Sequence, residues 1–147
     1  MNNSAGYTLA ELVVTIVLLG TLMTMAVPTY NKVINKAQKQ ANLSDMETIK
    51  NTFMQYHYVT HMQGNPHFPQ EPENSLLDST YRNIILGDGR TPDQLFSGDL
   101  PYNSNQNPYI YYWDDDTSAT GYITKRIIIK DTDPDSPSLN EYVVGEI

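Results

Sequence analysis

One carboxylate interrupts the longest apolar stretch of this 147-residue chain. Glu11 is the only charged residue before Lys32, and it stands at the start of a run that would be apolar without it. An acidic side chain in a membrane helix costs roughly 2.5 to 3.5 kcal/mol at the centre and less near an end, and such groups tend to serve a function. Glu11 is therefore the first candidate functional residue, with a lipid-interface position without a partner as the alternative.

A second acidic group lies near the C-terminus of the chain. Asp131, Asp133 and Asp135 offer three carboxylates at alternate positions, as in the opening of a calcium-binding loop. Ser136 stands where that loop would have glycine, so the segment is not an EF-hand. The pattern leaves two interpretations open, a Ca²⁺ site of another kind or a solvated acidic turn.

No other set of residues indicates catalysis. The chain has no cysteine, no glycine-rich phosphate loop and no serine in a nucleophile-elbow context. His57 and His61 have a spacing that can bind a metal on one helical face, but no third ligand is evident, which favours exposed or packing histidines. We therefore expect a protein that is not an enzyme.

The segment around Glu11 is long enough to cross a membrane. Residues 12–27 carry no charge, and about 20 apolar residues span a bilayer as a helix. A secretory signal peptide would need a basic region before the apolar run and a small-residue cleavage site after it. Residues 1–6 contain no Lys or Arg, so we interpret the segment as a membrane span.

Apolar residues continue at helical spacing beyond the span. From Val33 to Tyr56 they recur mostly three and four positions apart, and no strong helix breaker appears before Gly64. The pattern predicts one helix from Thr8 to about Gln63. Pro28 lies inside it and removes a backbone hydrogen bond, so we expect a bend there, or local melting on assembly.

The remaining sequence predicts a small sheet. Residues 64–109 are rich in Pro, Asn, Gly and Asp, which predicts a long loop with one short helix. Strands are predicted over 109–113, 122–130 and 141–147, with a turn at 114–121 that includes a solvated Asp114-Asp115-Asp116. The sheet should be antiparallel and cover the apolar stripe of the helix, which gives an α+β fold.

The N-terminal residues resemble a known family signature. Gly6-Tyr7-Thr8-Leu9-Ala10-Glu11, the apolar run and Pro28 resemble the start of type IV pilins and of type II secretion pseudopilins. The resemblance implies that a prepilin peptidase removes a leader, residues 1–6, by cleavage between Gly6 and Tyr7, and that Tyr7 is N-methylated. Residues 7–30 would be the transmembrane and assembly half of the helix, and 31–147 a soluble pilin head.

The resemblance also implies a function. The chain would be a structural subunit of a type IV pilus or pilus-like filament, in which Glu11 pairs with the N-terminal amine of a neighbour and so offsets the cost of its burial. Its partners would be copies of itself, the prepilin peptidase and the inner-membrane assembly machinery. Major pseudopilins carry a calcium site in an acidic C-terminal loop, which implies Ca²⁺ at Asp131, Asp133 and Asp135.

Location and alternatives follow from the same features. The resemblance implies a single-pass inner-membrane protein that enters a periplasmic or extracellular filament, although Lys32, Lys36 and Lys39 alone would place the C-terminal part in the cytoplasm. Residues 64–147 carry five basic and 14 acidic side chains, a net charge of −9, which argues against nucleic-acid binding.

The alternatives to a pilus subunit are a type II secretion pseudopilin or minor pilin, and a membrane-anchored binding domain that never polymerises.

Overall fold

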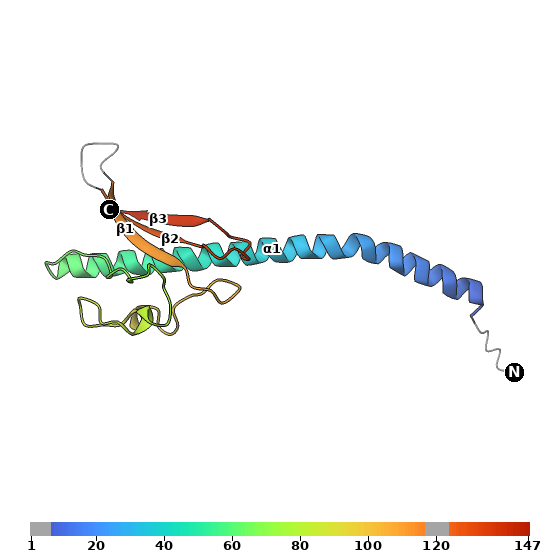
Figure 1. Cartoon of the computed structure of the whole chain (residues 1–147), viewed down its shortest axis with the longest axis horizontal. Coiled ribbons are helices and arrows are strands. Elements are labelled where there is room, and N and C mark those ends of the chain that lie inside the picture. The colour runs from blue at the N-terminus through green and yellow to red at the C-terminus, as the bar shows by residue number, and fades with distance from the viewer. Residues whose placement is uncertain (1–6, 117–123) are drawn as a thin grey trace. The chain divides into compact units, whose positions relative to one another are not determined.

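The computed structural model describes residues 7–116 and 124–147 and shows one long helix followed by a small sheet (Figure 1). The elements in chain order are α1 (Leu9–Met62), the 3₁₀ helix η1 (Tyr81–Asn83), α2 (Pro92–Leu95), β1 (Ile110–Asp116), β2 (Thr124–Lys130) and β3 (Tyr142–Glu146). The predicted α+β class is confirmed. The leader with Gly6, most of the predicted turn and the first two residues of the second predicted strand lie outside the described residues.

The chain divides into two compact units, Met1–Ala37 and Gln38–Ile147, and α1 runs through both. In the first unit α1 continues without interruption through Pro28. One 18-residue window of α1 has a mean hydropathy of 2.1, enough for a membrane span, and none of it is buried. The helix therefore begins and ends within one residue of the predicted limits, while melting at Pro28 on assembly stays a prediction.

The core of the second unit lies between α1 and the sheet. The predicted apolar stripe is confirmed, because Met46, Ile49 and Phe53 are fully buried in one cluster with β-strand side chains. The Phe53 ring meets the ring of Tyr111 from β1 edge to face, with centroids 4.6 Å apart. The long helix and the sheet thus stabilise each other by excluding water from a shared apolar surface.

β3 passes close to side chains of α1 at Gly145. A methyl group on Gly145 would come within 3.0 Å of the Met54 sulfur and 3.1 Å of the Lys50 side chain. A Cβ rarely makes contacts this tight, so a larger residue at position 145 would require the neighbouring side chains to move by a few tenths of an ångström. Glycine at this position thus favours close packing of β3 on α1.

The three strands form an antiparallel sheet in the order β1-β2-β3. The predicted turn beginning at Asp114 is wrong, because β1 continues to Asp116. Asp114 lies opposite Arg126 and Asp115 opposite Lys125, and the Arg126 guanidinium donates to both Asp114 oxygens at 3.1 Å. Opposite charges facing each other across a ladder favour pairing, and this extends the strand into an acidic run.

The segment between α1 and β1 covers the free edge of β1. The Leu77 amide donates to the Tyr109 carbonyl at 2.9 Å, and the Tyr111 amide donates to the Ser75 carbonyl at 2.8 Å. The segment contains two short helices, η1 and α2, where the sequence predicted one. A Thr91–Gln94 contact explains the second, since the Gln94 side chain accepts from the Thr91 amide at 3.0 Å and caps α2 at its start.

Candidate functional site

Glu11 lies in the first turn of α1 and closes a capping box with Thr8. Its carboxylate accepts hydrogen bonds from the Thr8 amide and the Thr8 hydroxyl, both at 2.9 Å. The Thr8 hydroxyl oxygen in turn accepts from the Glu11 amide at 3.3 Å. Two amides at the helix start that would lack a partner are thus satisfied reciprocally. The carboxylate is fixed one turn from Tyr7, the residue that processing would make the new N-terminus.

Asp131, the first residue of the acidic triplet, directly follows β2 in the chain and is completely buried. Its carboxylate accepts from the hydroxyls of Ser136 at 2.5 Å and Ser138 at 2.6 Å, and from the Asn103 amide group at 3.3 Å. The backbone amide of Asp133 is a fourth donor at 3.1 Å. These neutral donors replace the water that Asp131 loses on burial.

Asparagines surround the second carboxylate of the triplet. Asp133 accepts from Asn103 at 3.0 Å and from Asn105 at 2.8 Å. Hydrogen bonding, above all from Asn107 and then from Asn105, lowers the pKa of Asp133 to about 2. The group is therefore ionised at neutral pH. Asp135 is exposed.

One residue of α1 ties this loop to the helix. Asn42, fully buried, donates to Ser138 at 2.7 Å and to Ser136 at 3.1 Å, and its side-chain oxygen accepts from the Ser104 amide at 2.9 Å. Ser136 and Ser138 in turn donate hydrogen bonds to the Asp131 carboxylate. A single network of hydrogen bonds therefore joins α1, the turn at residues 103–107 and the acidic loop.

This arrangement does not fit a calcium site well. Calcium takes six to eight oxygen ligands, mostly carboxylate and carbonyl. The described residues contain no group of three His, Cys, Asp or Glu side chains that could hold a metal ion. Hydroxyl and amide donors already occupy the carboxylates of Asp131 and Asp133, while Asp135 is exposed and its backbone amide donates to Asp133 at 3.1 Å. Calcium binding at the triplet stays a prediction that no contact here supports.

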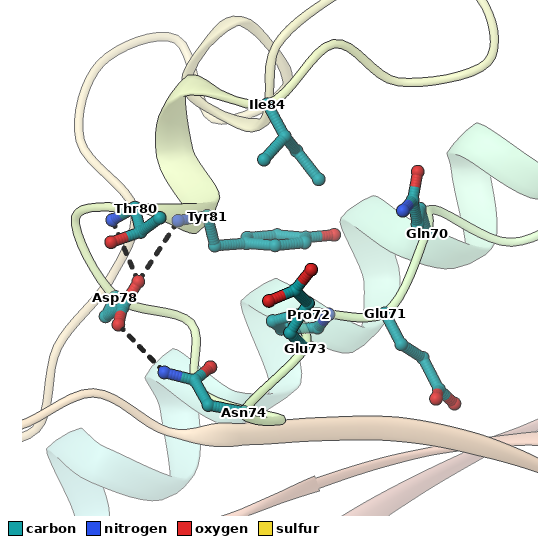
Figure 2. A pocket seen from close by; sticks show the side chains of 9 residues that line it. All are labelled: Gln70, Glu71, Pro72, Glu73, Asn74, Asp78, Thr80, Tyr81 and Ile84. Atoms are coloured by element: carbon teal, nitrogen blue, oxygen red, sulfur yellow. Dashed lines mark hydrogen bonds between the residues drawn. The ribbon is translucent and has the colours of Figure 1, made fainter.

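A cavity of about 360 Å³ opens between residues 70–74 and η1 (Figure 2). The residues that line it include Tyr81, Pro72 and Ile84, and three acidic residues, Glu71, Glu73 and Asp78, also belong to the lining. No lysine, arginine or histidine lines it. The cavity thus joins an apolar wall to a negatively charged rim.

The tyrosine of this cavity has an unusual hydroxyl group. Tyr81 is 1% exposed, and its hydroxyl has no hydrogen-bond partner among the described residues. In Figure 2 the ring lies between Ile84 and Pro72, and its oxygen points toward the side where Gln70 and Glu71 stand. Burial, followed by electrostatic interaction with Tyr56 and Glu71, raises the pKa of Tyr81 far above its usual range, so the phenol stays protonated.

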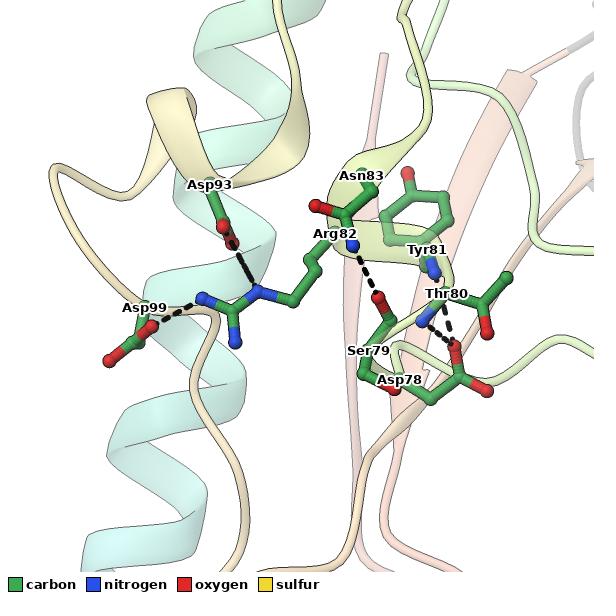
Figure 3. A network of polar contacts seen from close by, with 8 residues as sticks. All are labelled: Asp78, Ser79, Thr80, Tyr81, Arg82, Asn83, Asp93 and Asp99. Carbon is green, nitrogen blue, oxygen red and sulfur yellow. Dashed lines mark hydrogen bonds and ion pairs between the residues drawn. The ribbon is translucent and has the colours of Figure 1, made fainter.

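Three carboxylates hold the residues of η1 in place (Figure 3). Asp78 accepts from the backbone amides of Thr80 at 2.8 Å and Tyr81 at 3.1 Å, which orients the first turn of η1. On the other side of η1, Arg82 donates to Asp93 at 2.9 Å and pairs with Asp99 at 2.5 Å. The hydrogen bonds of Asp78 and the ion pairs of Arg82 thus hold the backbone around Tyr81 from two sides.

His57, predicted to be an exposed or packing residue, is buried against Phe68 with ring centroids 4.8 Å apart. Its Nδ1 has no hydrogen-bond partner among the described residues. Burial, followed by electrostatic interaction with His61, Lys125 and His67, lowers the pKa of His57 below its usual value of 6.5. The side chain is therefore a neutral packing element at pH 7.

Comparison with known proteins identifies the N-terminal segment. Residues 1–27 match the family described as the prokaryotic N-terminal methylation motif. The chain carries the prepilin-type signal sequence of type IV pilins. The signal supports a type IV pilin-like or pseudopilin protein, and it indicates a structural protein rather than an enzyme. No curated protein and no solved structure gives a significant match to the chain.

The prepilin-type signal contains a feature that the sequence analysis missed. Thr8-Leu9-Ala10-Glu11 has the pattern Ser/Thr-x-x-Glu of a capping box, which can be recognised without a structure. Glu11 thus has a local role at the helix start in addition to any role between subunits. The signal also implies processing by a prepilin peptidase, and together with the apolar helix it indicates membrane anchoring.

Proposed function

We propose that this chain is a structural subunit of a type IV pilus or pilus-like filament. The observation that carries the proposal is the lone carboxylate of Glu11 at the start of an exposed apolar helix within a prepilin-type signal. Most apolar side chains of residues 9–27 are half exposed or more in the isolated chain, as Leu12, Ile16 and Leu19 are at 57% each. Such a surface needs lipid or neighbouring helices to cover it.

The assembly step follows from charge. Cleavage between Gly6 and Tyr7 leaves a new amine on Tyr7, and a subunit that moves from lipid into a filament core offers this cation to a neighbour. Pairing with Glu11 offsets the desolvation of the carboxylate, whereas a subunit in the wrong register leaves both charges buried and unpaired, at a cost of about 3–5 kcal/mol. Glu11 therefore selects the register of assembly.

The first experiment tests processing. Intact-mass analysis of protein extracted from the membrane should give a chain that begins at Tyr7 and carries one additional methyl group. A chain that keeps residues 1–6 in cells with an active prepilin peptidase contradicts the proposal. Electron microscopy of the same cells then separates a long surface filament from the short periplasmic filament expected of a pseudopilin, and from an anchored domain that forms none.

The second experiment separates the two roles of Glu11. Glu11→Gln keeps the side-chain acceptor of the capping box but removes the charge, and Thr8→Ala weakens the box but keeps the charge. If Glu11 pairs with a neighbouring amine, Glu11→Gln loses filaments while Thr8→Ala keeps most of them. The reverse result would assign Glu11 to helix capping alone and refute the register mechanism. Both variants should insert in the membrane normally, as fractionation would show.

A further inference from the structure

The cavity beside η1 combines three properties that favour one kind of ligand. Its wall is apolar, its rim carries Glu71, Glu73 and Asp78, and its lining contains no cation. A basic side chain matches this combination, because an aliphatic stem covers the apolar wall while the charged end reaches the carboxylates. The volume of about 360 Å³ is larger than such a side chain needs.

Two of the three carboxylates in the cavity lining already accept hydrogen bonds from backbone amides. Asp78 is occupied by the backbone of η1, and Glu71 accepts from the Trp113 amide at 2.6 Å. Glu73 is exposed and makes no hydrogen bond or ion pair with any described residue. It is therefore the carboxylate of the rim that is free to bind a cation.

The buried hydroxyl of Tyr81 is an independent sign of an incomplete site. A buried polar atom without a partner is destabilising by about 1–3 kcal/mol and is rare in folded proteins. The hydroxyl points toward the side of the cavity formed by Gln70 and Glu71 (Figure 2). A donor entering there, with a small shift of these two flexible side chains, would give the phenol oxygen its missing partner.

We propose that this cavity binds a lysine side chain of a second copy of the chain, supplied by Lys32 or Lys36. Both are exposed, one helical turn apart, and form no ion pair with any residue that the structure describes, whereas Lys39 and Lys50 pair with carboxylates. The proposal rests on the proposed filament, which brings copies of the chain together. Within it, the contact joins the head of one subunit to the helix of the next.

The contact is tested on assembled filaments of the full chain. A water-soluble carbodiimide forms an amide between an amine and a carboxylate that touch, and filaments grown from mixed ¹⁵N-labelled and unlabelled subunits distinguish links between copies from links within one. We expect mixed-isotope peptides that join Lys32 or Lys36 to Glu73. Glu73→Gln should remove the link, and Glu146→Gln, a change of an exposed carboxylate on β3, should leave it unchanged.

Charge reversal gives a second readout. Glu73→Lys should reduce filament yield about two- to fivefold, as expected for one exposed ion pair, and Glu73→Lys combined with Lys36→Glu or Lys32→Glu should restore it. Normal filaments without the mixed-isotope link, or with links only within one copy, overturn this inference and leave the filament function standing. Absence of any filament from the unaltered, processed chain overturns the filament function and this inference with it.

Discussion

Replacing Asn42 tests whether hydrogen bonds hold the acidic loop on α1. Asn42→Ala removes four hydrogen bonds, three to the hydroxyls of Ser138, Ser136 and Ser104 at 2.7, 3.1 and 3.4 Å and one from the Ser104 amide at 2.9 Å. Each is worth about 0.5–1.5 kcal/mol, and the change also leaves a small cavity at a fully buried position. We expect the free energy of unfolding of the head to fall by about 3 kcal/mol, and its melting temperature by about 10 °C.

The chain supplies its own probe for this measurement. Trp113 is the single tryptophan and lies in β1, so its fluorescence follows unfolding of the head in the full-length protein held in detergent. Gln40→Ala is the matched control, since Gln40 lies on the same helix, is exposed and makes no hydrogen bond with a described side chain. Equal melting temperatures for the two variants would refute the tie between Asn42 and the loop.

Three further changes have definite expected results in the same fluorescence assay. Because the pKa of His57 is lowered in the folded state, the unfolded state takes up a proton on His57 first as the pH falls. The free energy of unfolding should therefore be highest above pH 6.5 and decrease below it. His57→Gln should remove this pH dependence. Tyr111→Phe should lower the free energy of unfolding by about 1–3 kcal/mol, because the Tyr111 hydroxyl donates to the buried Pro69 carbonyl at 2.8 Å. Tyr81→Phe should lower it much less, because the Tyr81 hydroxyl has no partner to lose among the described residues. Equal losses for the two variants would contradict the finding that the Tyr81 hydroxyl has no partner. The melting temperature should be the same with calcium and with chelator, because neutral donors already occupy Asp131; a calcium-dependent rise that Asp131→Asn abolishes would establish the calcium site.

Local patterns made the long helix and the sheet predictable. Apolar spacing and the absence of breakers before Gly64 located α1, and the stripe of Met46, Ile49 and Phe53 is buried as its spacing predicted. Residues of β2 alternate in burial in the same way, since Ile127 and Ile129 are buried and Arg126 and Ile128 are only partly buried. Each of these signals arises within about ten residues, where sequence periodicity directly reflects which face is buried.

Long-range pairing was not predictable in the same way. Asp114 and Asp115 resemble a turn when taken alone, and only their opposition to Arg126 and Lys125 makes them a strand. The network around Asp131 was unpredictable for the same reason. Asn42, nearly 90 positions earlier in the chain, donates to Ser136, and Ser136 donates to Asp131. A pattern of alternate aspartates is compatible with a metal, with water or with amide donors, and tertiary contacts decide between them.

The magnitudes of these contacts show how a chain without cysteine secures its C-terminal loop. Lys39 pairs with Glu141 at 2.5 Å, but about two fifths of each side chain is exposed, so the pair contributes roughly 0–1 kcal/mol. The buried network from Asn42 to Asp131 contributes more, because breaking it leaves polar groups without water or a partner. A hydrogen-bond network of neutral donors depends neither on oxidation, as a disulfide does, nor strongly on salt. The head can therefore keep its fold in a reducing or an oxidising compartment, which suits a subunit proposed to fold at a membrane and then leave it.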